Sequence, residues 1–205
     1  MPDVTADPVV DPLAALLATC GRQVAPRLLG SVITRAGVSI RLTEVEAYDG
    51  ADDPASHAWR GRTPRNAVMF GPAGRLYVYF TYGMHHAANL VCGPVGTASA
   101  VLLRAGEVVD GTALAHERRG TDDPSRLARG PGNLAQALGL TLADNGAVNG
   151  SGFDWEPAGR RPRPIGNGTR VGVSRAADRP WRWWVLGDRT VSAYRRSPRA
   201  DPPLD

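Results

Sequence analysis

The chain has 205 residues, of which 42% are hydrophobic and 21% charged, the composition of an ordinary globular domain. No apolar run approaches the roughly 18 residues that a membrane-spanning helix requires, so we expect no such helix. The net charge is +4, and the chain contains no lysine, so its basic excess is arginine. A lysine amine is therefore excluded as a nucleophile, and the modest positive charge suits a polyanionic partner without proving one.

The N-terminal quarter predicts a loose tail, two short helices and a pair of strands. Residues 1–11 form the tail, and Asp11-Pro12 begins a helix that Gly21 is expected to end. The tail is acidic and contains prolines, unlike a secretory signal, so we expect a cytoplasmic protein. Apolar and polar residues then alternate over residues 31–48, with a turn at Ala36-Gly37, which predicts two strands.

The rest of the chain predicts a single α+β domain. Residues 49–74 indicate a long structured loop, residues 75–92 a β-hairpin that turns at Tyr82-Gly83, and residues 99–105 a strand. Beyond these we expect helices within 110–139, irregular chain at 144–170, strand-like stretches within 171–192 and a disordered tail at 197–205. We predict one domain over residues 12–196, with a curved, mostly antiparallel sheet, peripheral helices and a protruding β-hairpin.

The segment RLTEVEAYDG carries two glutamates at strand spacing. Because side chains alternate along a strand, Ile40, Leu42, Glu44, Glu46 and Tyr48 share one phase, which the two aliphatic residues mark as buried. A buried carboxylate is costly unless it is paired or has a chemical task. The alternative is an edge strand or a bulge that turns both glutamates outward, and the pattern alone does not decide between the two.

The strand SAVLLRA offers a partner for a buried carboxylate. Arg104 shares the phase of Leu102 and Ala100, so its guanidinium points toward an apolar face. A Glu–Arg pair across the sheet would keep the carboxylate ionised, and an ionised carboxylate beside a water is what a general base requires. A purely structural salt bridge explains the pair equally well.

Four of the five tyrosines cluster around the glutamate strand and the hairpin: Tyr48, Tyr77, Tyr79 and Tyr82. Tyr77 and Tyr79 face the same way, whereas Tyr82 lies near the hairpin tip. An aromatic side chain at an exposed tip is well placed to wedge into a stack of nucleic-acid bases. The alternative is that these tyrosines pack in the core with their hydroxyls reaching water.

Two further segments suit a phosphate backbone. The loop HAWRGRTPRN supplies, within nine residues, His57, Arg60, Arg62 and Arg65. Gly130-Pro131-Gly132 opens a helix with free backbone amides, which is a ready anion site. A solvated loop explains the arginines as well, and the glycine motif is weak by itself.

The histidines and cysteines do not predict a metal site. His85 and His86 are adjacent on a strand and therefore point to opposite faces. Cys20 and Cys92 are scattered, with no HxxxH or CxxC spacing in the chain, so we expect no metal and two reduced thiols.

Five segments together match a known family. They are TEVEAYDG with ADDPASHAWRGRTPRN, MFGPAGRLYVYFTYGMHHAANLVC, AVLLRAGEV, RGPGNLAQALGL and RVGVSRAADRPWRWWVLGDRTVS. The chain resembles the alkyladenine (3-methyladenine) DNA glycosylases of the mammalian type, which also occur widely in bacteria. The segments follow the family's order over about residues 28–192. Their combination is highly specific.

The resemblance implies a role for each matching residue. Glu46 matches the general base that activates the attacking water, and Arg104 matches the residue that helps to hold that water and the glutamate. The residues that match the pocket around a flipped base are Tyr48, His57 and Tyr79. Asn89 matches the asparagine that discriminates against the exocyclic amine of guanine, and Tyr82 matches the side chain that enters the gap left in the duplex. The residues expected to contact the DNA backbone are Arg62, Arg65, Gly130 and Gly132.

The sequence departs from the family pattern at a few places outside this set. Asn133 stands where the family often has lysine, and Trp183-Trp184 replaces a more usual Phe-Tyr pair. Residues 144–168 match poorly. These departures put affinity and substrate range in doubt, but not the catalytic set.

The resemblance implies a monofunctional glycosylase that acts on damaged double-stranded DNA and leaves an abasic site. Its expected substrates are alkylated or deaminated purines, with 3-methyladenine first and hypoxanthine or ethenoadenine as further candidates. We expect a monomer without cofactor or metal, in the cytoplasm at the bacterial nucleoid. One alternative is a non-catalytic damage-binding protein, whose mark would be loss of Glu46 or Arg104. The other is a bifunctional glycosylase that uses the amine of Pro2, but no zinc-finger cysteines accompany it.

Overall fold

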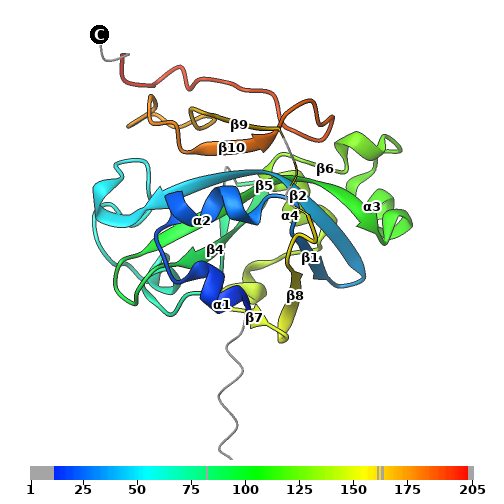
Figure 1. Cartoon of the computed structure of the whole chain (residues 1–205), viewed down its shortest axis with the longest axis horizontal. Coiled ribbons are helices and arrows are strands. Elements are labelled where there is room, and N and C mark those ends of the chain that lie inside the picture. The colour runs from blue at the N-terminus through cyan, green and yellow to red at the C-terminus, as the bar shows by residue number, and fades with distance from the viewer. Residues whose placement is uncertain (1–11, 82, 161, 163, 203–205) are drawn as a thin grey trace, which may run out of the picture.

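Two long antiparallel strands, β2 (Val38–Asp49) and β5 (Ser99–Asp110), form the centre of the fold. The computed structural model describes residues 12–81, 83–160, 162 and 164–202. Figure 1 shows β2 and β5 crossing the middle of the molecule, with β9 and β10 in a layer on one side and α1, β7 and β8 on the other. The central pair carries Tyr48 on β2 and Leu102 and Arg104 on β5, which line the candidate site.

The remaining strands extend the sheet from both edges of the central pair. The order is β3-β4-β5-β2-β1-β8-β7, while β10 pairs with β2 and β9, and β6 pairs with β5. All of these pairs are antiparallel except β7 with β8. The other strands are β1 (Val32–Arg35), β3 (Leu76–Thr81), β4 (His85–Cys92), β6 (Ala128–Arg129), β7 (Val148–Asn149), β8 (Gly152–Glu156), β9 (Ile165–Gly168) and β10 (Arg182–Val185). The prediction of an α+β fold on a curved, mostly antiparallel sheet is confirmed.

Short helices cover the sheet and close its main core. They are α1 (Pro12–Leu17), α2 (Gly21–Leu28), α3 (Thr112–Arg119) and α4 (Pro131–Ala137), with 3₁₀ turns η1 (Gly50–Asp52), η2 (Ala67–Phe70), η3 (Pro124–Arg126) and η4 (Leu142–Asp144). α2 packs on β2, and α4 packs on β4 and β5. No helix in the described part of the chain has the length and apolar character needed to cross a bilayer.

The sheet carries apolar clusters on both faces. Leu90 of β4 and Val101 of β5 belong to the main core, whereas their neighbours Val91 and Ala100 belong to a second, smaller cluster. Because side chains alternate along a strand, the two clusters lie on opposite faces. The second cluster includes residues of the loop at 50–74, and the candidate site lies on this side.

Gly21 begins a helix instead of ending one. α1 ends at Leu17, and Gly21 is the first residue of α2, so the predicted helix boundary is wrong. The backbone N–H of Gly21 donates to Asp49 Oδ1 at 3.0 Å and to Ser99 Oγ at 2.7 Å. A Cβ at this position would lie 2.9 Å from the carbonyl oxygen of Ala100. A glycine is therefore required where α2 approaches the central strands.

The C-terminal third differs in detail from the prediction. Strands β8 and β9 lie within residues expected to be irregular, and of the stretches predicted at 171–192 only Arg182–Val185 forms a strand. β8 alternates buried and exposed residues but has only five of them, and β9 contains two glycines, so their sequence signals are weak. The domain limits and the two tails stay predictions, because residues 1–11 and 203–205 lie outside the described part.

Candidate active site

A cavity of about 330 Å³ lies on the side of the sheet that carries the second apolar cluster. Its walls come from β2 to β5, from the loop after β2 and from residues 171–174. The lining residues are Tyr48, Pro54, Ala55, His57, Met69, Tyr77, Tyr79, Thr81, Ala87, Asn89, Leu102, Arg104, Pro131, Val171, Gly172, Val173 and Ser174. This volume is within the range of small-molecule pockets. The sheet therefore supplies the rigid walls, and two irregular segments complete them.

Glu46 lies behind this lining, with no exposed surface of its own. Its Oε1 accepts from the backbone N–H of Val171 at 2.7 Å, and its Oε2 accepts from the hydroxyl of Tyr48 at 3.0 Å. The Nε of Arg104 is 3.5 Å from Oε1. All three partners line the cavity. Each carboxylate oxygen can accept two hydrogen bonds, so these partners leave acceptor capacity beside the cavity.

Glu44 is also fully buried, but its carboxylate is occupied by structural partners. Its Oε1 accepts from Arg104 Nε and from Arg182 Nη1, both at 3.0 Å, and its Oε2 accepts from the backbone N–H of Ser192 at 2.8 Å. Two guanidinium groups therefore compensate one carboxylate. Glu44 ties β2 to β5, to β10 and to the segment after β10.

Irregular pairing in the middle of β2 determines where the two glutamates point. The register between β2 and β5 shifts on each side of Glu44. Beyond the shift Val45 joins Ile40 and Leu42 in the main core, and Glu44 and Glu46 contact arginines instead. The prediction that both glutamates share the face of Ile40 and Leu42 is therefore wrong. The alternative was an irregularity in the strand that turns both glutamates outward. The register shift does turn Glu44 and Glu46 away from the face of Ile40 and Leu42, but both carboxylates meet buried partners instead of solvent.

Arg104 stays positively charged and Tyr48 stays protonated, so both can donate hydrogen bonds to the carboxylate of Glu46. Burial by itself lowers the pKa of Arg104, but the carboxylates of Glu46 and Glu44 outweigh it, so the net shift is upward. Burial raises the pKa of Tyr48 well above its ordinary value, and the charge of Glu46 adds to that shift. Tyr48 therefore stays protonated and donates its hydroxyl hydrogen to the carboxylate.

Aromatic rings form one wall of the cavity. Tyr77 and Tyr79 of β3 stack with ring centroids 5.4 Å apart, and the ring of His57 meets Tyr79 edge-on at 4.6 Å. Tyr48 of β2 lines the same cavity. The structure thus brings together three residues predicted for the base pocket, Tyr48, His57 and Tyr79. It adds Tyr77, for which the sequence indicated only a common direction with Tyr79.

The hydrogen bond between His57 and Tyr77 selects one tautomer of the imidazole. His57 Nδ1 lies 3.1 Å from the hydroxyl of Tyr77. Burial raises the pKa of Tyr77 and outweighs the opposite effect of Arg65, so that hydroxyl keeps its proton. Burial and Arg65 both lower the pKa of His57, which favours the neutral ring. Tyr77 then donates to Nδ1, which leaves Nε2–H of His57 as a hydrogen-bond donor.

Asn89 lies in the body of the hairpin. It is buried on β4, faces Tyr77 of β3 and Leu102 of β5 in register, and lines the cavity. Its Nδ2 donates to the carbonyl oxygen of Tyr77 at 3.2 Å. The amide is therefore held by the facing strand at the wall of the cavity, not by the hairpin turn.

The residues predicted to contact a nucleic-acid backbone lie in two separate segments, the loop after β2 and the start of α4, and none of them lines the cavity. Arg62 and Arg65 are exposed, and Arg65 Nη2 donates to the carbonyl oxygen of Phe80 at 3.2 Å. Gly130 precedes α4 and Gly132 lies in its first turn, on either side of Pro131, which lines the cavity. Tyr82, the predicted wedge, lies outside the described residues.

Two buried charged residues at the site were missed by the sequence reasoning. Asp53 and Arg170 form an ion pair whose side chains are both fully buried, and Arg170 directly precedes Val171. They are 117 residues apart in the chain, so no local spacing could reveal the pair. The only available signal was a charged residue at the start of RVGV.

The described residues contain no group of three or more histidine, cysteine, aspartate or glutamate side chains that could hold a metal ion. Cys20 and Cys92 are free thiols, and burial raises the pKa of Cys92. The carboxylate, arginine and aromatic side chains at the cavity are the groups whose geometry the structure gives.

Comparison with known proteins gives a consistent match over most of the chain. The family model described as methylpurine-DNA glycosylase (MPG) matches residues 16–189. Three curated relatives carry the name "Putative 3-methyladenine DNA glycosylase". That of Corynebacterium efficiens is 54% identical over 86% of this chain and 93% of its own length, and that of Cutibacterium acnes is 54% identical over 84% and 95%. That of Rhodococcus jostii is 56% identical over 84% of this chain and 81% of its own length.

Proposed function

Because the chain belongs to the methylpurine-DNA glycosylase family, we propose that it removes alkylated purines from DNA by hydrolysing the N-glycosidic bond. The observation that carries the proposal for the site is the buried Glu46 behind an aromatic cavity, held by Arg104, Tyr48 and Val171. A purine inside a duplex cannot reach such a cavity, so the enzyme must flip the base out of the stack. The cavity then receives the base, and the glutamate faces its glycosidic bond.

In the proposed mechanism Glu46 is the general base and water is the nucleophile. The carboxylate accepts a proton from a water that attacks the sugar carbon as the bond to the base breaks. Arg104 holds the carboxylate from the side of the cavity, and Tyr48 and Val171 fix its two oxygens. The electron pair of the broken bond leaves with the purine, and the products are the free base and an abasic site.

The aromatic wall is proposed to hold the flipped base and to assist its departure. Tyr48, His57 and Tyr79 offer π-faces and edges on which a planar purine can stack. A cationic base such as 3-methyladenine leaves readily, so positioning of base and water supplies most of the catalysis. Neutral bases such as hypoxanthine or ethenoadenine also need a hydrogen bond or a proton as they leave. The Nε2–H of His57 is a suitable donor.

We propose a monofunctional enzyme, because the chain has no lysine that could form a Schiff base with the sugar. Pro2, the remaining candidate amine, lies outside the described residues. The assay that tests the proposal incubates the protein with duplex DNA containing alkylated purines and measures the release of free base. Release without strand cleavage is the expected result. Strand cleavage during excision would favour the Pro2 mechanism, and tight binding without release would favour a damage-binding protein.

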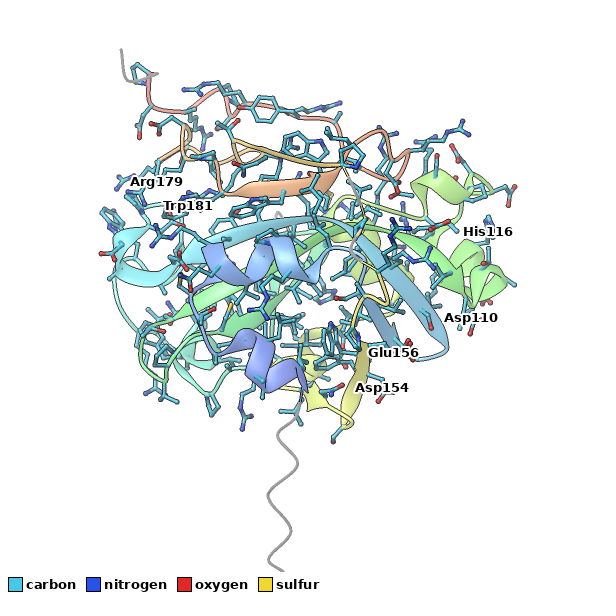
Figure 2. All side chains as sticks on the ribbon, in the orientation of Figure 1. Asp110, His116, Asp154, Glu156, Arg179 and Trp181 are labelled. Carbon is cyan, nitrogen blue, oxygen red and sulfur yellow. The ribbon has the colours of Figure 1, made fainter. Side chains whose placement is uncertain are left out.

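The charge distribution supports a face for DNA. Residues 170–199 contain eight arginines and two carboxylates, and six of these arginines remain after the buried, paired Arg170 and Arg182 are set aside. Figure 2 shows Arg179 at the end of the molecule where the C-terminal segment meets the loop after β2, whereas Asp110, Asp154 and Glu156 lie at the opposite end. Phosphates are attracted to arginines and repelled by carboxylates. We propose that the duplex binds at the end of the molecule that carries Arg179, with additional backbone contacts at Arg62, Arg65, Gly130 and Gly132.

We further propose that the protein acts as a monomer in the cytoplasm and without a metal ion. A wedge that enters one duplex needs no two-fold symmetry, and the proposed mechanism uses water, a carboxylate and aromatic side chains alone. Light scattering of the free protein tests whether it is a monomer. Excision in the presence of a chelator tests whether a metal ion is needed. A concentration-dependent dimer, or loss of activity with chelator, would contradict these proposals.

Replacing Asn89 by serine is expected to admit guanine-derived bases. Asn89 lines the cavity, and a close wall rejects the amino group of guanine by clash and by burying its N–H donors without acceptors, at about 1–3 kcal/mol per unmet group. We expect the ratio of 7-methylguanine to hypoxanthine excision to rise roughly tenfold. Asn145→Ser is the control, because it removes an amide that accepts from Val78 N–H outside the cavity lining. An unchanged ratio in Asn89→Ser would refute the selectivity role.

Replacing Tyr82 by alanine is expected to weaken base flipping. One stacking aromatic contributes about 1–3 kcal/mol, so flipping should fall by a factor of roughly 5 to 150. A duplex containing the fluorescent base ethenoadenine reports flipping directly, and excision should fall in parallel. Tyr82→Phe keeps the ring and should retain most of the effect. Normal flipping in Tyr82→Ala would return this residue to a packing role.

A further inference from the structure

A second buried ion pair lies behind Tyr48, and the proposed mechanism does not use it. Arg170 Nη1 is 2.5 Å from Asp53 Oδ2 and Arg170 Nη2 is 2.8 Å from Asp53 Oδ1, a bidentate pair with no exposed side-chain surface. Buried ion pairs of this kind contribute little to stability relative to apolar residues of the same volume, because both charges must be desolvated. A role other than stability would therefore lie in the contacts that the pair makes with the site.

Arg170 contacts the candidate site at two points, and the next residue contacts it at a third. Its Nη1 donates to the carbonyl oxygen of Ala47 at 3.0 Å, between Glu46 and Tyr48 on β2. Its guanidinium carbon lies 4.7 Å from the ring centroid of Tyr48. The next residue, Val171, donates its N–H to Glu46 Oε1. The Arg170 side chain thus contacts the backbone and the aromatic ring beside Glu46, and the backbone of Val171 binds the carboxylate itself.

Asp53 anchors Arg170 to the loop after β2. Its N–H donates to Gly50 O at 3.3 Å, and its Oδ1 accepts from the N–H of Ala55 at 3.2 Å, next to Pro54 and Ala55 in the cavity lining. The guanidinium of Arg170 also lies 5.0 Å from the ring centroid of Trp181. Figure 2 shows Trp181 beside Arg179 at this end of the molecule, and Arg179 Nη1 donates to Asp52 O at 2.7 Å. The pair therefore connects two irregular segments through the back of the site.

We propose that Arg170 and Asp53 are a positioning pair that sets the ring of Tyr48 and the carboxylate of Glu46 for base excision. This inference rests on the proposed roles of Glu46 and Tyr48. A lysine in place of Arg170 keeps the charge but has no planar fork, so it cannot bind both oxygens of Asp53 and the carbonyl of Ala47 at once. Neither residue of the pair touches the substrate in this scheme.

The first test compares Arg170→Lys with a matched control, Arg35→Lys. Arg35 also binds an aspartate, Asp144, at 2.9 and 2.7 Å and also donates to backbone carbonyls, but it lies outside the cavity lining. Single-turnover excision of ethenoadenine is measured well below both melting temperatures, together with the fluorescence of the flipped base. We expect Arg170→Lys to excise at least tenfold more slowly and to change that fluorescence, with Arg35→Lys within about twofold of wild type. Equal rates and fluorescence in the two variants would overturn the proposal.

The second test removes the charge of Asp53 and measures how the excision rate depends on pH. It does not require Arg170→Lys to fold. The charged and titratable groups around Glu46 are Tyr48, Glu44, Arg104, Arg170 and, in register on β10, Arg182. Asp53→Asn leaves Arg170 without its counter-charge, which favours the ionised carboxylate of Glu46. The acidic limb of the excision rate against pH should therefore move to lower pH. A purely structural pair would lower the rate without moving the limb, and an unmoved limb overturns the proposal.

Base excision by the wild type and by Glu46→Gln is measured in the same assay. These two rates distinguish failure of the positioning pair from failure of the proposed function. If wild type releases no base, the proposed function fails. If Glu46→Gln excises as fast as wild type, the proposed role of Glu46 fails. If wild type is active, Glu46→Gln is inactive and the Arg170 and Asp53 variants behave like the control, only the positioning pair fails.

Discussion

Glu46→Gln is expected to abolish base release while leaving the binding of lesion DNA largely intact. The amide has the shape of the carboxylate, and its oxygen can still accept from the N–H of Val171 or from the hydroxyl of Tyr48. It cannot take a proton from water at neutral pH, so the excision rate should fall by at least the about 10²–10⁴-fold typical of a lost general base. Because the side chain has no exposed surface, the DNA-binding face should be unaffected.

The measurement pairs single-turnover excision of hypoxanthine with binding to the same duplex. Retained binding with lost excision assigns Glu46 to the chemical step. Excision near the wild-type rate would transfer the role of base to another group, and Glu44 would be the first candidate because it is the other buried carboxylate beside Arg104. A parallel loss of binding would instead indicate that the substitution disturbs the cavity wall.

Local patterns predicted most of the central fold because its elements are regular. The turn at Ala36-Gly37, where both residues have positive φ, and the strand-turn-strand pattern at 75–92 indicate β1 with β2 and β3 with β4, as observed. The face of Glu46 could not be predicted in this way. Strict alternation places it with Leu42, whereas the register shift at Glu44 reverses the order, and that shift arises where β2 exchanges one neighbour, β1, for another, β10. The sequence of one strand does not reveal which strands pair with it, so the register shift could not be predicted from β2 alone.

The candidate site was predictable where its residues lie in recognisable motifs, and hidden where they pair at long range. Arg104 was expected beside a glutamate because both occupy buried strand positions, and the structure places it beside two. Asp53 and Arg170 follow no pattern, because each lies in an irregular segment and its charge is compensated by a partner far away in the chain. The same holds for the N–H of Val171, since a backbone donor has no sequence signature.

Glu44→Gln should show the opposite phenotype to Glu46→Gln, with lost stability and a much smaller loss of rate. Glu44 compensates Arg104 and Arg182, whose side chains are 10% and 7% exposed. Neutralising it leaves two buried cations with reduced compensation, and breaking a buried pair in this way costs about 3–5 kcal/mol. Chemical denaturation should therefore show a lower free energy of unfolding by that amount, whereas excision measured on the folded protein should exceed that of Glu46→Gln by at least about tenfold.

Glu107→Gln is the matched control for this prediction. Glu107 makes the same type of contact to Arg41, at 2.7 Å, but both side chains are about half exposed, at 51% and 49%. Water solvates either charge when the other is removed, so this substitution should change the free energy of unfolding by less than about 1 kcal/mol. The difference between the two variants then measures burial, because the chemical change is identical. The contrary result is a Glu44→Gln variant that is as stable as Glu107→Gln and excises as slowly as Glu46→Gln. Glu44 would then act directly in catalysis, and the assignment of a structural role to Glu44 would be wrong.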